Sequence, residues 1–474
     1  MVAVEEAALA LALVPLFIGL IIPLLNAVKI AGARISLLLA IAAALSFTAS
    51  AVAVLAAGQG VTYFNGLVYH DNVSGMIMLG SGLAALIALA SAGLKPGGWS
   101  SHPAWYSLIP LALFGVFFLT GAIDTLMVLA AWLLVSVISY VIVALPDDLD
   151  SVRAAARYIY VGAVATILLS LWIAFNATVA GEYSLDPTGL APLNAERLSA
   201  LALATVLAGL GFKLGAAPFH WWLPSVYGRA DGKAIAVVSG MIKLGFIGLL
   251  TRIIVEASRA PMGFENLSGA GAIALVMAAA AVASMTYGNI AALTPTSVRA
   301  ILAYSSIAHV GYILTGLAAV AYAVNTSQQI LNLALAGIAL QAVAYGLAKT
   351  ALFATLPDSG DDIKEWARNL AATRIARISA SILLLSLLGL PPLLGFWGKL
   401  YLFLSAAGYS LLLVAIALVN SGISSFYYVR LVREILSSEP TGKIDRNYET
   451  GLLAAALLTL LLGLIAPLLV GLIA

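Results

Sequence analysis

The sequence predicts an all-α integral membrane protein that forms a single polytopic domain over residues 1–474. Three observations support this prediction. Of the residues, 62% are hydrophobic and only 9% are charged, with a mean hydropathy of +1.06. Apolar stretches long enough to cross a bilayer recur along the whole chain, and prolines and glycines interrupt two of them beside lysines. A chain of this composition uses lipid as its main solvent.

The spacing of the apolar stretches predicts about fourteen transmembrane helices. A helix rises about 1.5 Å per residue, so each crossing needs about 20 residues. Glu5 and Glu6 precede the first stretch without a basic segment, which indicates a retained helix rather than a cleaved signal peptide. The expected helices cover residues 7–26, 34–57, 73–93, 103–120, 122–145, 153–178, 198–218, 232–256, 268–289, 296–320, 328–356, 374–408, 409–434 and 450–473.

The distribution of basic residues predicts the orientation of these helices. With both termini outside, sixteen of the 23 lysines and arginines fall in inner loops or at inner helix ends. The outer side then holds only Arg197, Arg252 and Arg259. Because the inner loops of membrane proteins carry an excess of lysine and arginine, this bias predicts that both termini lie outside.

The remaining four basic residues lie within apolar stretches, and they are Lys213, Lys243, Lys349 and Lys399. A charged side chain near the bilayer centre costs roughly 3 to over 10 kcal/mol and therefore usually faces a protein interior or a wet cavity. Four such lysines predict a path for protons or ions. Lys349 is nearer the inner end, where a long side chain can instead reach the interface.

Two apolar stretches are interrupted beside these lysines. The seventh has Pro218 after Lys213, and the twelfth has Pro391 and Pro392 before Lys399. Proline removes an amide donor and clashes with the preceding turn, and non-helical backbone at membrane depth is tolerated only against protein or a water-lined cavity. We therefore expect helices seven and twelve to be broken next to polar cavities.

The order of lysine and proline is mirrored between these two helices, because the seventh is expected to run inward and the twelfth outward. An inverted-topology repeat produces such an order. We expect two five-helix repeats, at about 103–256 and about 268–434. Helices one to three, at 7–93, precede them, and a last helix at 450–473 follows.

Composition excludes several classes of function. A net charge of +2 is too small for a nucleic-acid-binding surface, and no cluster of metal ligands is apparent. Without cysteine, the chain cannot form a disulfide or hold a cysteine-ligated iron–sulfur cluster. An electron carrier would have to reside in another subunit. His70 and His102 lie in or beside loops, where we expect them to be solvated.

Four segments, residues 211–224, 239–246, 302–312 and 389–399, are dense in motifs such as Gly-Phe-Lys, Pro-Phe-His-Trp-Trp-Leu-Pro and Gly-Leu-Pro-Pro-Leu-Leu-Gly-Phe-Trp-Gly-Lys. Through them the chain resembles the antiporter-like proton-pumping subunits of respiratory complex I. That family is related to subunits of Mrp antiporters and membrane-bound hydrogenases. Among the complex I members, the sequence is most similar to the N-type subunit.

The resemblance implies a chain of titratable groups across the middle of the membrane. Lys213 would be the central proton carrier, and Lys243 and the region of His309 would lead toward it. Lys399 would lead to the outer exit, and Lys349 matches the lysine of a broken eleventh helix.

Other side chains are candidates for relay or support: His220, His309, Ser306 and Tyr345. The two histidines are equally compatible with a relay and with a packing role. Tyr345 stands where some relatives have a histidine, which weakens that relay position.

The sequence departs from the family at one important position. The family pairs its central lysine with a glutamate in a Trp-Glu-Leu pattern on the fifth helix. Here Trp132, Ser136 and Tyr140 align with that pattern, but the glutamate position is Leu133. Without that carboxylate the desolvation of Lys213 is uncompensated. Either a carboxylate of an adjoining subunit replaces it, or coupling is weak.

The resemblance implies a proton-translocating membrane subunit of a complex I-like oxidoreductase, using NADH and quinone or a related donor and embedded in the cell membrane. The chain would hold no cofactor, and its partner subunits would hold quinone and iron–sulfur clusters. Two alternatives remain. One is a cation/proton antiporter subunit of the Mrp or hydrogenase type, which would exchange sodium without an electron donor. The other is a structural subunit whose lysines only hold broken helices open.

Overall fold

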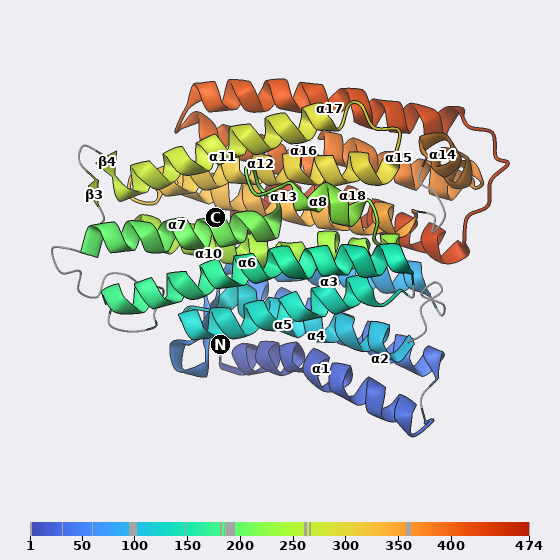
Figure 1. The fold of residues 1–474 in the computed structure, drawn as a ribbon, viewed down its shortest axis with the longest axis horizontal. Coiled ribbons are helices and arrows are strands. Elements are labelled where there is room, and N and C mark those ends of the chain that lie inside the picture. Colours follow the sequence, from blue (N-terminus) through green and yellow to red (C-terminus); the bar gives the residue numbers. More distant parts are fainter. Residues whose placement is uncertain are drawn as a thin grey trace.

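The computed structural model of the protein describes residues 2–30, 32–58, 60–93, 102–146, 148–180, 183, 185, 195–259, 263–264, 267–356 and 362–473. These residues are almost entirely helical, which confirms the predicted fold class. The helices lie roughly along the long axis of the molecule, and both chain ends lie toward the left side of the view (Figure 1).

The elements of the first part of the chain are α1 (Val2–Ala27), α2 (Ala33–Ala57), β1 (Val61–Tyr63), η1 (Phe64–Gly66), β2 (Val68–His70), α3 (Asn72–Ala92), α4 (His102–Gly121), α5 (Thr125–Ala144), α6 (Leu149–Ala180), α7 (Ala195–Leu214), α8 (Trp222–Tyr227), α9 (Gly232–Ile235), η2 (Ala236–Ile242) and α10 (Lys243–Arg259). Those of the second part are β3 (Gly263–Phe264), β4 (Leu267–Ser268), α11 (Gly269–Ala291), α12 (Val298–Ala323), α13 (Gln328–Ala354), α14 (Ile363–Ala371), α15 (Arg374–Leu388), α16 (Leu394–Ala407), α17 (Leu411–Ser437) and α18 (Arg446–Ile473).

Twelve helical segments of the described chain are long and apolar enough to cross a membrane, and each coincides with one of the expected spans. One of them, Gly232–Arg259, consists of α9, η2 and α10 in succession. The other two expected spans are α7, whose described apolar part is shorter, and the pair α15 and α16. The count of fourteen and the inverted repeat therefore stay predictions.

The chain is broken at both places where prolines follow or precede a buried lysine. Helix α7 ends at Leu214, and Gly215 adopts a φ of 73°, which a residue with a side chain rarely tolerates. Helix α15 ends at Leu388, and Gly389 adopts a φ of 94°. The prediction that Pro391 and Pro392 interrupt the twelfth span is confirmed, because α16 begins after them at Leu394.

The expected break in the eleventh span is wrong. Helix α13 runs without interruption through Lys349, because no proline lies within it and Gly346 is accommodated in the helix. The irregular segment near a lysine lies instead in the eighth span, where the π-helix Ala236–Ile242 ends directly before Lys243. Such π-helical turns are rare and frequently lie at functional sites.

The π-helix is packed tightly against α13. A Cβ atom at Gly346 would lie 2.8 Å from the carbonyl oxygen of Gly240, and one at Gly240 would overlap the hydroxyl of Thr350. These two glycines therefore allow the backbones to approach more closely than side chains would permit. The consequence is that the start of α10 lies against α13 in the centre of the bundle, where α12 is also almost fully enclosed.

A short hairpin, β1 with β2, covers one end of α4 and buries a histidine that the sequence analysis placed in solvent. His70 is 0% exposed. Its Nε2 atom lies 2.9 Å from the carbonyl oxygen of Phe117. Burial lowers the pKa of His70 to about 4, and Arg252 acts in the same direction. The prediction for this residue is therefore wrong. His102 begins α4, but its side chain lies outside the described part of the chain, as does that of Arg197.

A second contact ties this end of the bundle together. The guanidinium of Arg252 on α10 donates hydrogen bonds to the carbonyl oxygen of Tyr69, at 3.0 Å, and to the carboxylate of Asp71, at 3.3 Å. Asp71 also accepts the amide of Ser74 at the start of α3, at 2.8 Å. The hairpin is thus anchored to both α3 and α10.

We expect the protein to lose stability between pH 7 and pH 5 because of His70. The unfolded chain binds a proton at this residue near pH 6.5, whereas the folded chain binds it near pH 4. The unfolded state therefore holds more protons in this window, and the free energy of unfolding falls by about 2 kcal/mol at pH 5. Thermal unfolding of wild type and His70→Gln at several pH values measures this. An equal pH dependence in both proteins would contradict it.

Candidate functional site

The four lysines that the sequence singled out are all enclosed by protein. The exposed fractions of Lys213, Lys243, Lys349 and Lys399 are 5%, 3%, 0% and 4%. The ion pairs found among the described residues include none of the four. Each ammonium is therefore stabilised by groups other than a carboxylate of the described chain. Lys349 does not reach the interface.

Lys213 lies at the end of α7 among aromatic rings. Its Nζ atom is 4.8 Å from the ring centroid of Tyr140, 4.9 Å from that of Phe246 and 5.0 Å from that of Tyr158. The ring of Trp132 follows at 6.0 Å. These distances are within the range of cation–π attraction. No described residue forms a hydrogen bond with the ammonium.

Leu133, the position of the family's glutamate, is 42% exposed, whereas its neighbour Trp132 is fully buried. The leucine therefore takes no part in the surroundings of Lys213. Leu133 is exposed although it lies about one helical turn before the buried Ser136, so it is at the edge of the buried face of α5. A longer side chain at this position would start at that edge and not inside the bundle.

Aromatic side chains connect the surroundings of Lys213 to those of Lys243. Tyr158 stacks on Trp222 with ring centroids 5.1 Å apart, and Trp222 contacts Tyr227 edge to face at 6.3 Å. Tyr227 in turn lies 5.7 Å from the Nζ atom of Lys243. The indole of Trp222 is fixed by a hydrogen bond to the carbonyl oxygen of Phe212 at the α7 break, at 2.8 Å.

Tyr345 on α13 is shared by two lysines and a histidine. Its ring centroid lies 5.7 Å from the Nζ atom of Lys243, 5.8 Å from that of Lys349 and 5.6 Å from the ring of His309. Its hydroxyl hydrogen-bonds with that of Ser239 in the π-helix, at 2.8 Å. The tyrosine thus joins groups from α10, α12 and α13, although the sequence analysis considered it a weakened relay position.

The ammonium of Lys349 forms hydrogen bonds with α12. Its Nζ atom donates to the carbonyl oxygen of Leu302 at 2.7 Å and to the hydroxyl of Ser305 at 2.5 Å. Ser306, which the sequence analysis selected, donates to the same Leu302 carbonyl of its own helix at 2.8 Å. The lysine contact therefore belongs to Ser305, one residue earlier.

His309 bridges α13 and α17. Its Nδ1 atom lies 3.0 Å from the side-chain nitrogen of Gln341, and its Nε2 atom lies 3.0 Å from the hydroxyl of Tyr428. With this amide assignment the glutamine donates to Nδ1, so the Nε2–H donates to the tyrosine. Rotation of the amide would reverse the roles at both ring nitrogens, with the proton then on Nδ1.

Lys399 on α16 forms a hydrogen bond across the break between α15 and α16. Its Nζ atom donates to the carbonyl oxygen of Leu388, the last residue of α15, at 2.8 Å, and to the hydroxyl of Ser421 at 3.1 Å. The ring centroid of Tyr312 lies 4.6 Å from the same nitrogen. The ring of Tyr312 is 5.8 Å from that of His309, which connects Lys399 to the central group.

A polar cluster that was not predicted from the sequence lies between α11 and α17. The side chain of Asn289 donates to the hydroxyl of Tyr312 at 2.9 Å and to the backbone oxygen of Asn420 at 3.1 Å, and it accepts from Tyr427 at 2.9 Å. Asparagines within apolar stretches were the available signal, but a search for charged residues does not find them.

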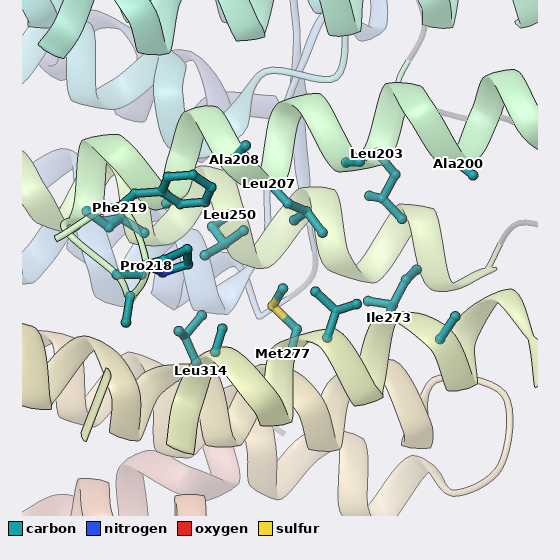
Figure 2. A pocket seen from close by; sticks show the side chains of 18 of the residues that line it. Ala200, Leu203, Leu207, Ala208, Pro218, Phe219, Leu250, Ile273, Met277 and Leu314 are labelled. Carbon is teal, nitrogen blue, oxygen red and sulfur yellow. The ribbon is translucent and has the colours of Figure 1, made fainter. Parts of the chain in front are cut away.

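His220 is not brought into this chain of contacts. It lies in the α7 break, half-buried, with its ring 4.0 Å from that of Tyr287 on α11. Pro218, Pro391 and Pro392 are exposed at the two breaks. A cavity of about 320 Å³ opens beside the first break, between α7 and α11, and is lined by side chains such as Leu207, Phe219 and Met277 (Figure 2). Because its lining has no titratable side chain, it is not part of the lysine path.

Broken helices and buried cations at mid-bundle define the architecture of a membrane transport protein. Residues 122–424 match the family described as "NADH:quinone oxidoreductase/Mrp antiporter, TM". The chain belongs to this family.

Individual relatives agree with this assignment. NADH-quinone oxidoreductase subunit N 2 of Acidobacterium capsulatum is 32% identical over 463 residues, covering 91% of this chain and 89% of that protein. A chain of respiratory complex I from Thermus thermophilus is 28% identical, with a TM-score of 0.77 and coverage of 97% and 98%. A chain of the Mrp complex from Dietzia sp. has a TM-score of 0.80 at 20% identity, covering 100% and 96%, which shows a common fold. The resemblance to the N-type subunit is confirmed.

We expect Gly398→Ala to disturb Lys399. A Cβ atom at Gly398 would lie 2.7 Å from both the Cα and the amide nitrogen of Gln341. Because backbone atoms cannot yield as a flexible side chain does, α16 must move away from α13, at a cost of about 1–3 kcal/mol. Proton translocation and thermal stability of the assembled complex should both fall. Gly422→Ala on α17 is the control, since no atom lies near its added Cβ. Equal behaviour of the two variants would refute the expectation.

Proposed function

We propose that this chain is the proton-translocating membrane subunit of an NADH-quinone oxidoreductase-like complex. One observation supports the proposal above all: the four buried lysines are linked across the bundle by tyrosines, His309 and hydroxyl groups. A lysine desolvated by burial can exchange protons that an exposed lysine would retain. The similarity to subunit N from Acidobacterium capsulatum adds the class of complex.

In the proposed path, protons move between Lys213, Lys243 and the central group of Tyr345, Lys349 and His309. They continue by way of Tyr428, Gln341 and Tyr312 to Lys399. Contacts between rings and ammonium groups do not transfer protons by themselves, so water must complete the links. His220 is not needed in this path, Ser306 interacts with Tyr345 within it, and Ser305 is added to it.

The redox chemistry would take place in partner subunits. A chain without cysteine cannot ligate an iron–sulfur cluster through thiolates. We therefore propose that the electron carriers and the quinone site lie in neighbouring chains, and that this subunit converts their energy into proton movement. The complex would reside in the plasma membrane with both termini of this chain outside, as the distribution of lysine and arginine indicates.

Replacing lysines of the path tests the function. In proteoliposomes that contain the whole complex, Lys213→Met or Lys399→Met should reduce the number of protons moved per electron, because an apolar side chain cannot carry a proton. Lys443→Met, at an exposed position before α18, is the matched control. Electron transfer to quinone, measured in parallel, reports whether the complex is intact.

Unchanged proton movement in both path variants would refute the proposal. The same vesicles distinguish the antiporter alternative: sodium exchange driven by a pH gradient, without any electron donor, would favour it. Loss of assembly in the lysine variants, with no loss of proton movement per electron in complexes that do form, would favour a structural role.

The orientation can be tested separately, because the chain contains no cysteine that would react in the background. We expect a Lys29→Cys variant, in the turn between α1 and α2, to react with an impermeant maleimide only from the inside. A Thr326→Cys variant, between α12 and α13, should react only from the outside. The opposite pattern would reverse the proposed topology. Reaction of both from one side would contradict an odd number of crossings between them.

A further inference from the structure

The ammonium of Lys213 is surrounded by four aromatic rings, which we call the Lys213 cage: Trp132 and Tyr140 of α5, Tyr158 of α6 and Phe246 of α10. The four ring centroids lie 4.8 to 6.0 Å from the Nζ atom. None of the other three buried lysines has more than two rings at such distances among the described contacts. The cage is therefore particular to Lys213.

The same nitrogen has no other partner within the described chain. It forms no hydrogen bond, whereas Lys349 and Lys399 each donate two. It also takes part in none of the four ion pairs described. A buried ammonium without compensation is strongly destabilising. The faces of aromatic rings carry partial negative charge and attract a cation, more so where water is excluded.

The rings are held in place by their own contacts. The indole nitrogen of Trp132 donates to the hydroxyl of Thr166 at 3.0 Å, and the hydroxyl of Tyr158 accepts from Ser139 at 3.3 Å. Trp132 and Phe246 meet edge to face at 5.1 Å, as do Tyr140 and Tyr158 at 4.9 Å. The rings thus form two edge-to-face pairs, each held by contacts other than those with the lysine.

Gly162 on α6 leaves room for the side chain of Tyr140. A Cβ atom there would overlap the hydroxyl of Tyr140. Since that hydroxyl is the far end of a side chain, the ring could move aside at small cost to the rest of the helix. The glycine therefore determines how close Tyr140 comes to Lys213.

We propose that the Lys213 cage stabilises the charged form of the lysine in place of a carboxylate. This inference rests on the proposed function, because it concerns the protonation of the same path. The four rings are positioning residues: they attract the ammonium but cannot accept its proton. A proton leaving Lys213 must therefore go to water or to a hydroxyl. The hydroxyl of Tyr140, which interacts with that of Ser136, is one such group.

The test compares ring removal with ring retention in proteoliposomes of the whole complex. Phe246→Leu should reduce the rate of proton movement about tenfold, which corresponds to about 1.4 kcal/mol. Phe246→Tyr retains a ring and should stay near wild type. Phe47→Leu removes a fully buried ring on α2, over which no described lysine lies, and is the control. A loss in Phe246→Leu no greater than in Phe47→Leu would overturn the proposal.

A second comparison separates the cage from general packing. Phe246→Leu should shift the pH dependence of proton movement, because it removes part of the stabilisation of the charged lysine. Phe246→Tyr and Phe47→Leu should leave the pH dependence unchanged, because the first retains the ring and the second changes a ring away from Lys213. A packing defect would lower proton movement at every pH without a shift, so an unshifted profile in Phe246→Leu would count against the cage.

Three further variants complete the design. If Phe246→Leu does not assemble, Gly162→Ala displaces the Tyr140 ring instead, and a reduction in proton movement is again expected. Lys213→Met and Lys399→Met distinguish a failure of the cage from a failure of the proposed function. If both leave proton movement unchanged, the proposed function fails. If Lys213→Met abolishes proton movement while the ring variants do not affect it, only the cage fails.

Discussion

The structure depends on keeping four ammonium groups inside a bundle whose described residues offer them no carboxylate. Such groups are costly to bury unless other partners compensate them. Lys349 and Lys399 find backbone carbonyls and hydroxyls. Lys213 and Lys243 find aromatic faces and no hydrogen bond. The irregular features of the fold, its two breaks and its π-helix, lie beside three of these side chains, Lys213, Lys399 and Lys243.

The two broken helices satisfy the constraint differently, although their lysines and prolines are arranged as mirror images along the chain. At the second break, the freed carbonyl of Leu388 accepts a hydrogen bond from Lys399. At the first break, the carbonyl of Phe212 is occupied by the indole of Trp222. Lys213 therefore gains nothing from the break beside it. Two similarly broken helices thus stabilise their lysines differently. Backbone and hydroxyl oxygens accept hydrogen bonds from Lys399, whereas aromatic rings surround Lys213.

The sequence was sufficient for the fold class and for the lysines, because charges and prolines in apolar stretches have few explanations. It was not sufficient for features that depend on packing between distant helices. The π-helix before Lys243 contains no proline that would have predicted it. Gly240 allows close packing against α13, and this depends on how near Gly346 lies in the fold. His70 could not be seen as buried, because its burial depends on how the hairpin folds over α4.

The candidate site shows the same limit at the level of single residues. Ser306 and Ser305 are adjacent and chemically identical, and only the helix rotation decides which of them meets Lys349. Asn289 and Asn420 form a cluster with Tyr312 because α11 and α17 lie side by side. From the sequence, Leu133 predicted either a carboxylate from an adjoining subunit or weak coupling. The rings could not be foreseen, since the four around Lys213 come from three helices that are separated in the sequence.

The position of Tyr345 determines how the path is connected. Its ring contacts Lys243, Lys349 and His309, so three routes meet at one side chain. In the proposed path, Lys349 would then be a side branch and not a link in series. It would hold a proton near Tyr345 while protons pass between Lys243 and His309. In such a branched path, proton transfer at Tyr345, and not the number of lysines, would limit the rate of proton movement through the subunit.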